Sequence, residues 1–98
     1  MHAQELADEL WPQLRQIAQV RGLQKVIRVE MTVGAMHKVQ VAPLCEYFKQ
    51  YFRGTNFQSA VLTVSTVAAG QMFSPPGADE PIPASGWEIL ITTLDGSE

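Results

Sequence analysis

The N-terminus and two histidines carry the most distinctive chemistry in this sequence. The chain opens Met1-His2, and its other histidine is His37. A free α-amine, the deprotonated amide of residue 2 and a neutral imidazole at residue 2 can wrap a square-planar Ni(II) or Cu(II) ion, a geometry that nitrogen-rich sites favour. Because an amide must lose its proton, such binding depends strongly on pH. Met1 and His2 are therefore candidate metal ligands.

Each candidate also has an ordinary interpretation. A histidine at position 2 is commonly just an exposed polar residue, and a lone loop histidine such as His37 is commonly solvated or caps a turn. Cys45 lies on an apolar helical stripe, which favours a small buried hydrophobe. As the only cysteine, it can form neither an internal disulfide nor a four-cysteine metal site. It fits a reducing cytoplasm.

Composition excludes several classes of protein. The chain has 98 residues, 46% of them hydrophobic, and a net charge of −3, which indicates one folded domain spanning residues 1–98. Its basic residues are scattered from Arg15 to Arg53, unlike the clusters of a nucleic-acid binder. No apolar run is long enough to cross a membrane, and the N-terminus does not resemble a signal peptide. We expect no enzyme, because no nucleophile–base pair or phosphate-binding glycine loop is present.

Hydrophobic periodicity predicts two amphipathic helices and three strands. The helices are expected at residues 4–21 and 42–53, and the strands at residues 26–34, 58–67 and 87–94. Pro12 lies inside the first helix and predicts a kink, or a division into two shorter helices. The order favours an α+β fold, a small three-stranded sheet with both helices packed on one face. Residues 68–86 are expected to form a long proline-rich loop.

Alternation along the strands predicts which side chains face the helices. On the first strand, Ile27, Val29, Met31 and Val33 are expected to point one way. On the last strand, Trp87, Ile89 and Ile91 are expected to share a face.

Connectivity predicts where the candidate ligands lie. The first helix runs away from the N-terminus, and the following strand runs back along it for a similar length. Residues 34–38 should therefore return to the end of the domain where the chain begins. We expect Met1, His2 and His37 to lie in one neighbourhood, with Cys45 as a further candidate.

Segments along nearly the whole chain resemble one known family. They are Met1-His2 with Leu6-Ala7-Asp8, then residues 25–34, 44–48, 53–55, 60–64 and 86–91. Their order and spacing resemble the HypA/HybF-type hydrogenase nickel-incorporation proteins. The resemblance implies a cytoplasmic metallochaperone that binds nickel at Met1 and His2. It also implies delivery of nickel to the [NiFe]-hydrogenase large-subunit precursor, together with a nickel-handling GTPase.

The sequence departs from the family pattern at two places. The family has Glu at position 3, beside the nickel, where this chain has Ala3; helical geometry swings Glu5 well round the axis. The family's zinc module, two Cys-x-x-Cys pairs, is replaced by residues 68–86, which contain no cysteine or histidine. We therefore expect nickel and no zinc, and hypothesise that His37 joins or replaces part of the nickel shell.

These departures leave a second interpretation open. The chain could be a metal-free docking scaffold that binds a hydrogenase subunit or assembly factor.

The long segment before the last strand permits exchange of that strand between two copies, and an uncovered sheet edge permits edge pairing. Either arrangement would give a homodimer.

Overall fold

The computed structural model describes the whole chain, residues 1–98, as helices and strands in the predicted order. The elements are α1 (Ala3–Val20), β1 (Lys25–Gly34), the 3-10 turn η1 (Ala35–His37), α2 (Val41–Phe52), β2 (Val61–Val67), β3 (Met72–Phe73), β4 (Ile82–Pro83) and β5 (Ile89–Ser97). Both helices fall within a residue of their predicted positions. The second and third predicted strands begin later than expected, at Val61 and Ile89.

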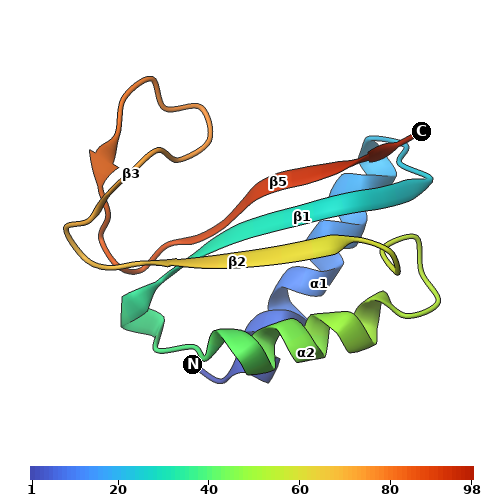
Figure 1. Cartoon of the computed structure of the whole chain (residues 1–98), viewed down its shortest axis with the longest axis horizontal. Coiled ribbons are helices and arrows are strands. Elements are labelled where there is room, and N and C mark those ends of the chain that lie inside the picture. The colour runs from blue at the N-terminus through green and yellow to red at the C-terminus, as the bar shows by residue number, and fades with distance from the viewer.

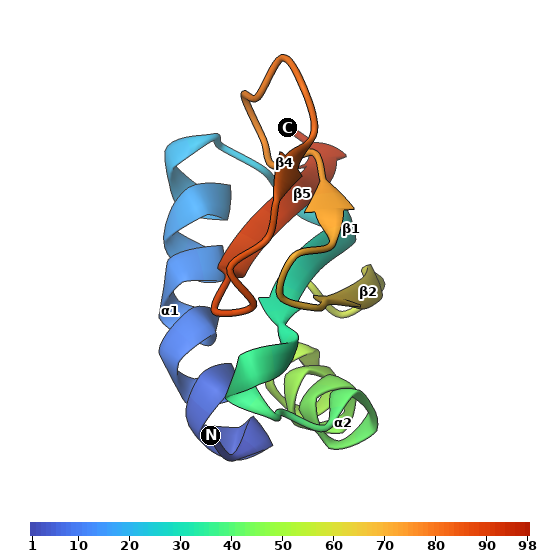
Figure 2. The same cartoon turned by 90° about the vertical axis from the view of Figure 1, so that its left-hand side faces the viewer.

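The main sheet has the order β2-β1-β5, so β1 is its central strand. β1 runs parallel to β2, which requires the crossover that α2 provides, and antiparallel to β5. Both helices lie on the same side of this sheet, as Figures 1 and 2 show from two directions. The predicted α+β architecture, a three-stranded sheet with two helices on one face, is confirmed.

The core lies between the helices and that face of the sheet. α1 contributes Leu6, Leu10 and Leu14, and α2 contributes Leu44, Phe48 and Phe52, all of them buried. These are the stripes that the helical spacing predicts. Burying one such side chain stabilises the fold by about 1.5–3 kcal/mol.

α1 continues unbroken through Pro12, so the alternative of two shorter helices is wrong, and a kink at Pro12 stays a prediction. Proline removes the N–H that would reach the Asp8 carbonyl. Pro12 and Asp8 are both on the exposed side of α1, where water can satisfy that carbonyl. Neither helix is long and apolar enough to cross a membrane.

One residue of β1 faces opposite to its predicted direction. Val29, Met31 and Val33 are buried as expected, but Ile27 is 51% exposed and Val26 takes the inward place. The pairing of β1 with β5 shifts register between Val26 and Arg28. Such a bulge inserts an extra residue and breaks the alternation, so Ile27 points to solvent.

The last strand differs from its prediction in a similar way. Ile89 and Ile91 pack against the core as expected. Trp87 precedes β5 and is 58% exposed. The prediction of one shared face for all three is therefore wrong at Trp87.

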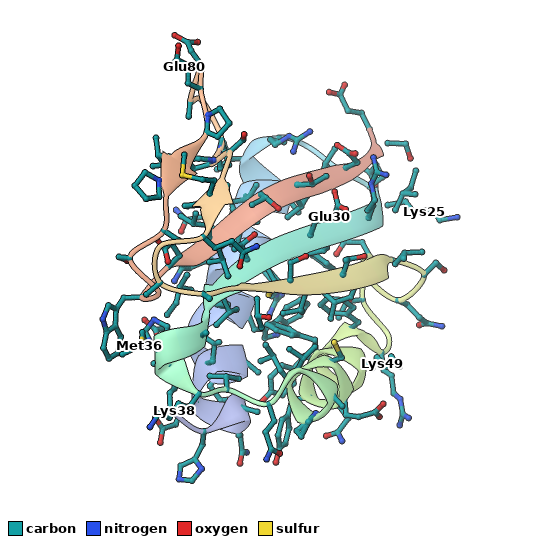
Figure 3. The ribbon with its side chains drawn as sticks, turned by 60° about the vertical axis from the view of Figure 1, so that its left-hand side comes forward. Lys25, Glu30, Met36, Lys38, Lys49 and Glu80 are labelled. Carbon is teal, nitrogen blue, oxygen red and sulfur yellow. The ribbon has the colours of Figure 1, made fainter.

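Residues 68–86 form a projecting segment that we call the arm. The expected loop contains a short antiparallel hairpin, in which Met72 pairs with Pro83 and Phe73 with Ile82. The arm stands away from the main sheet beyond the end of β1 (Figure 1). Glu80 lies at its outer tip, remote from Met36 and Lys38 in the turn after β1 (Figure 3).

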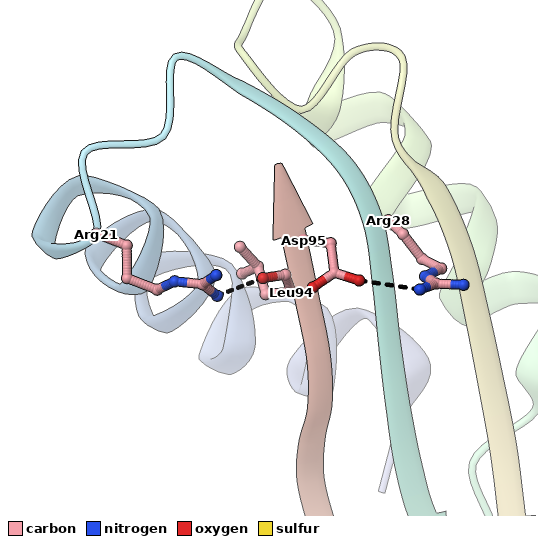
Figure 4. A network of polar contacts seen from close by, with 4 residues as sticks. All are labelled: Arg21, Arg28, Leu94 and Asp95. Carbon is pink, nitrogen blue, oxygen red and sulfur yellow. Dashed lines mark hydrogen bonds and ion pairs between the residues drawn. The ribbon is translucent and has the colours of Figure 1, made fainter. Parts of the chain in front are cut away.

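Two arginines hold the far end of β5 (Figure 4). Arg21, at the end of α1, donates to the Leu94 carbonyl, and Arg28 pairs with Asp95 at 2.9 Å. β5 thus pairs with β1 of its own chain. β2 and β5 are the two edges of the sheet, and both edge pairing and exchange of β5 between two copies stay predictions.

Candidate metal centre

His2 occupies the position immediately before α1. Its backbone is extended, with φ −78° and ψ 145°, and its carbonyl accepts the N–H of Leu6 at 3.2 Å. Because the amide of an N-cap residue lies outside the helix, it has no intrahelical partner. The His2 amide donates no hydrogen bond to the protein, and its side chain is exposed and caps nothing. Of the three nitrogens in sequence, the α-amine, the His2 amide and the His2 ring, the amide and the ring therefore have no hydrogen-bond partner in the protein.

The α-amine contacts the segment that follows β1. The Met1 ammonium donates to the backbone carbonyl of His37 at 3.0 Å. β1 therefore brings residues 34–38 back to the start of the chain, and the meeting predicted from connectivity is confirmed. The N-terminus lies beside the beginning of α2 in Figure 1.

The His37 side chain points toward the start of β5. His37 ends η1 and is half-buried; the next residue, Lys38, has the left-handed conformation, with φ 55°. The Nε2 atom of His37 lies 2.8 Å from the Trp87 carbonyl oxygen, and the His37 and Trp87 rings meet edge to face with centroids 5.3 Å apart. A carbonyl can only accept, so Nε2 carries a proton, and in the neutral ring the lone pair of Nδ1 is left free.

A pocket of about 390 Å³ lies at the N-terminus. Met1, His2 and Ala3 form one side of it, with Lys38 and Tyr47 among the residues opposite. No carboxylate lines it: Ala3 supplies none, and Glu5 is not among the lining residues. His37 is not a lining residue either, so its contact with this region runs through its backbone carbonyl.

The donor set is accordingly small. No group of three or more His, Cys, Asp and Glu side chains is placed to hold a metal ion. The structure brings Met1 into contact with His37, while the His37 ring is engaged by Trp87. A square-planar ion at this end would draw three of its four ligands from the α-amine, the amide and the imidazole of residues 1 and 2, an arrangement that needs no cluster of side chains.

Cys45 fits its ordinary interpretation. It is half-buried on α2 and does not line the N-terminal pocket. Burial raises the pKa of the thiol, and Glu46 adds to this, while Lys49 opposes it. The thiol is therefore the stable form at neutral pH, which makes Cys45 a poor metal ligand.

A larger groove of about 640 Å³ lies between the second half of α1 and Asn56. Its only charged lining residue is Arg15, and no histidine, cysteine or acid borders it. This groove therefore lacks metal ligands.

Two residues beside the candidate site were not predicted from the sequence to have a role there. They are Trp87, whose carbonyl engages His37, and Glu88, whose carboxylate organises the turn around it. The spacing from Ser85 to Glu88, a serine followed three residues later by a glutamate, is that of a capping box. That spacing was the available signal, although here it lies ahead of a strand.

Comparison with known proteins bears on the fold. The sequence matches no family model and no curated protein. The whole chain superposes on the solution structure of the Ni metallochaperone HypA from Helicobacter pylori, with a TM-score of 0.71. This chain has the HypA fold. The two sequences are 16% identical, and the match covers 100% of both chains, so the HypA resemblance seen in the sequence is confirmed for the fold.

Proposed function

We propose that this chain is a nickel-binding metallochaperone that acts in maturation of [NiFe]-hydrogenase. The observation that carries the proposal is that the His2 amide and ring have no hydrogen-bond partner and the Met1 α-amine makes a single exposed contact, at the start of a whole-length HypA fold. The matched structure is that of a nickel metallochaperone. By family resemblance, the partners would be a nickel-handling GTPase and the hydrogenase large-subunit precursor.

Nickel is cargo in this proposal, and the chain's own groups exchange protons to receive it. The α-amine loses its proton and releases the His37 carbonyl, a single exposed contact. The His2 amide loses its proton without breaking any hydrogen bond in the protein. Each step releases a proton, so affinity rises with pH. Met1 and His2 provide three nitrogens, and His37 Nδ1 is the proposed fourth.

Calorimetric titration of Ni(II) into untagged protein tests the site. We expect about one equivalent bound by the native chain, none by His2→Ala, and weaker binding by His37→Ala. A Gly-Ser extension before Met1 is the matched control, because it keeps His2 but removes the α-amine from its place; it should abolish binding. Unchanged binding by the extended chain or by His2→Ala would refute an N-terminal chelate.

The missing carboxylate gives a second test of the same site. Ala3→Glu restores the family's acid at position 3, next to His2 and at the start of α1, where a negative charge is also favourable. We expect tighter nickel binding with little change in thermal stability. A variant that binds no more tightly would show that Ala3 does not limit the site.

The metal-free docking scaffold is the second candidate function. The observation that favours it is the absence of any carboxylate from the N-terminal pocket and of any three-residue donor cluster. It predicts that the native chain binds no nickel in the titration yet still binds a hydrogenase subunit or assembly factor. Partner binding that requires nickel would exclude it.

A further inference from the structure

The turn that joins the arm to β5 is built around the carboxylate of Glu88. Its Oε2 accepts the backbone N–H of Ser85 at 2.7 Å and the Ser85 hydroxyl at 3.1 Å, and its Oε1 accepts the N–H of Gly86 at 2.9 Å. Desolvation would raise the pKa of Glu88, but these hydrogen bonds outweigh it and hold the pKa below its ordinary value. The bonds are charge-assisted and stronger than neutral ones.

Ser85 completes the turn from the other side. Its hydroxyl oxygen accepts the backbone N–H of Trp87 at 3.1 Å while the hydroxyl donates to Glu88. The peptide groups on both sides of Gly86 are therefore tied, directly or through Ser85, to one carboxylate. The Trp87 carbonyl belongs to the next peptide group of the same turn, between Trp87 and Glu88.

The turn is also anchored to the segment that carries His37. The N–H of Gly34 donates to the Glu88 carbonyl at 2.6 Å, and the N–H of Met36 donates to the Gly86 carbonyl at 2.8 Å. These two bonds hold the turn against the chain segment that contains η1. The Trp87 carbonyl then meets His37 Nε2 at 2.8 Å.

We infer that Glu88 is a positioning residue for His37. It shapes the turn so that the Trp87 carbonyl holds the Nε2–H tautomer and leaves Nδ1 as the only ring nitrogen free to bind a metal. Histidines that bind metals usually donate their other ring N–H to a carbonyl or carboxylate in this way, which fixes ring and tautomer. The consequence for nickel rests on the proposed function; the effect on the His37 tautomer does not.

Nitrogen NMR of the His37 ring in metal-free protein tests the positioning directly. At a pH where the ring is neutral, the native chain should show the Nε2–H tautomer. Glu88→Gln keeps the side-chain shape but loses one acceptor oxygen, so both tautomers should become populated. Glu80→Gln, the same change at the exposed arm tip (Figure 3), is the matched control and should leave the ring unchanged. An unchanged tautomer in Glu88→Gln would overturn the inference.

Ser85→Ala provides a milder variant if Glu88→Gln is poorly folded. It retains both amide donors to Glu88 and removes only the two hydroxyl contacts. Its circular dichroism spectrum should match the native chain, with a smaller shift toward the second tautomer. If Glu88→Gln does not fold, a native-like tautomer population in Ser85→Ala would overturn the inference.

A double-mutant cycle tests the link to the metal. Loss of a group that orients a metal-binding histidine typically costs about 10–100-fold in affinity, so Glu88→Gln should weaken nickel binding about tenfold. In a His37→Ala background the same change should cost nothing further. An equal loss in both backgrounds would overturn the inference, because the effect would not pass through His37. If the native chain binds no nickel, the proposed function fails while the tautomer result still decides the role of Glu88.

Discussion

Gly34 is the position where a single added methyl group should do the most damage near the site. A Cβ there would lie 2.6 Å from the Glu88 amide nitrogen and nearer still to the Gly86 carbonyl. Its backbone is ordinary, with φ −66°, so the cost is purely steric. Forcing in a methyl group costs about 1–3 kcal/mol. Separating the two segments also breaks the Gly34–Glu88 and Met36–Gly86 hydrogen bonds, each worth about 1 kcal/mol.

Gly34→Ala should therefore lower the free energy of unfolding by about 3–5 kcal/mol. The melting temperature should fall by at least roughly 12 °C for a chain of this length. The control is Gly22→Ala, where a Cβ meets nothing within 4 Å and only the positive φ of 67° opposes the change. That control should cost about 1–2 kcal/mol. If Gly34→Ala loses no more stability than Gly22→Ala, the close contact between the backbones at Gly34 and Gly86 is refuted.

Three further outcomes follow from the core, the surface and the titrating groups. Phe48→Ala empties a fully buried position and should cost about 3–5 kcal/mol in urea denaturation, whereas Asp95→Asn breaks an exposed pair and should cost less than about 1 kcal/mol. Because burial raises its pKa, Cys45 should react with iodoacetamide more slowly than free cysteine at neutral pH, and urea should remove the difference. The lowered pKa of Glu88 means that its charge stabilises the folded state above the unfolded pKa, near 4.5, and that this is lost as pH falls through the lower folded value. The stability gap between the native chain and Glu88→Gln should accordingly be present at neutral pH and close in acid; a gap that persists there would contradict the assignment.

Periodicity predicted the helices and the architecture because both depend on local spacing. Leu6, Leu10 and Leu14 repeat at helical intervals, and their burial follows from that repeat alone. The contact between Met1 and His37 was predictable for a similar reason, since a helix and a returning strand of comparable length must bring their outer ends together. These features need no knowledge of side-chain packing.

The errors arise where pairing between distant strands decides the outcome. Ile27 faces solvent because of a bulge, and the bulge exists only when β1 meets β5. Trp87 was expected to be inward because alternation was extended through a turn that Glu88 organises. The His37 tautomer likewise depends on a carbonyl 50 residues away, and no local pattern encodes it.

That separation in sequence has a consequence for the order in which the protein is made. His37 emerges from the ribosome 50 residues before Trp87, and β5, the strand that completes the sheet, follows later still. At about 5–20 residues per second, a nascent chain spends several seconds with both histidines synthesised and neither β5 nor the Trp87 carbonyl in place. We expect a ribosome-bound chain stalled within the arm to hold His37 in both ring tautomers. The fixed tautomer of His37 is thus a mark of a chain translated through β5, and it separates the fully folded protein from an unfinished one.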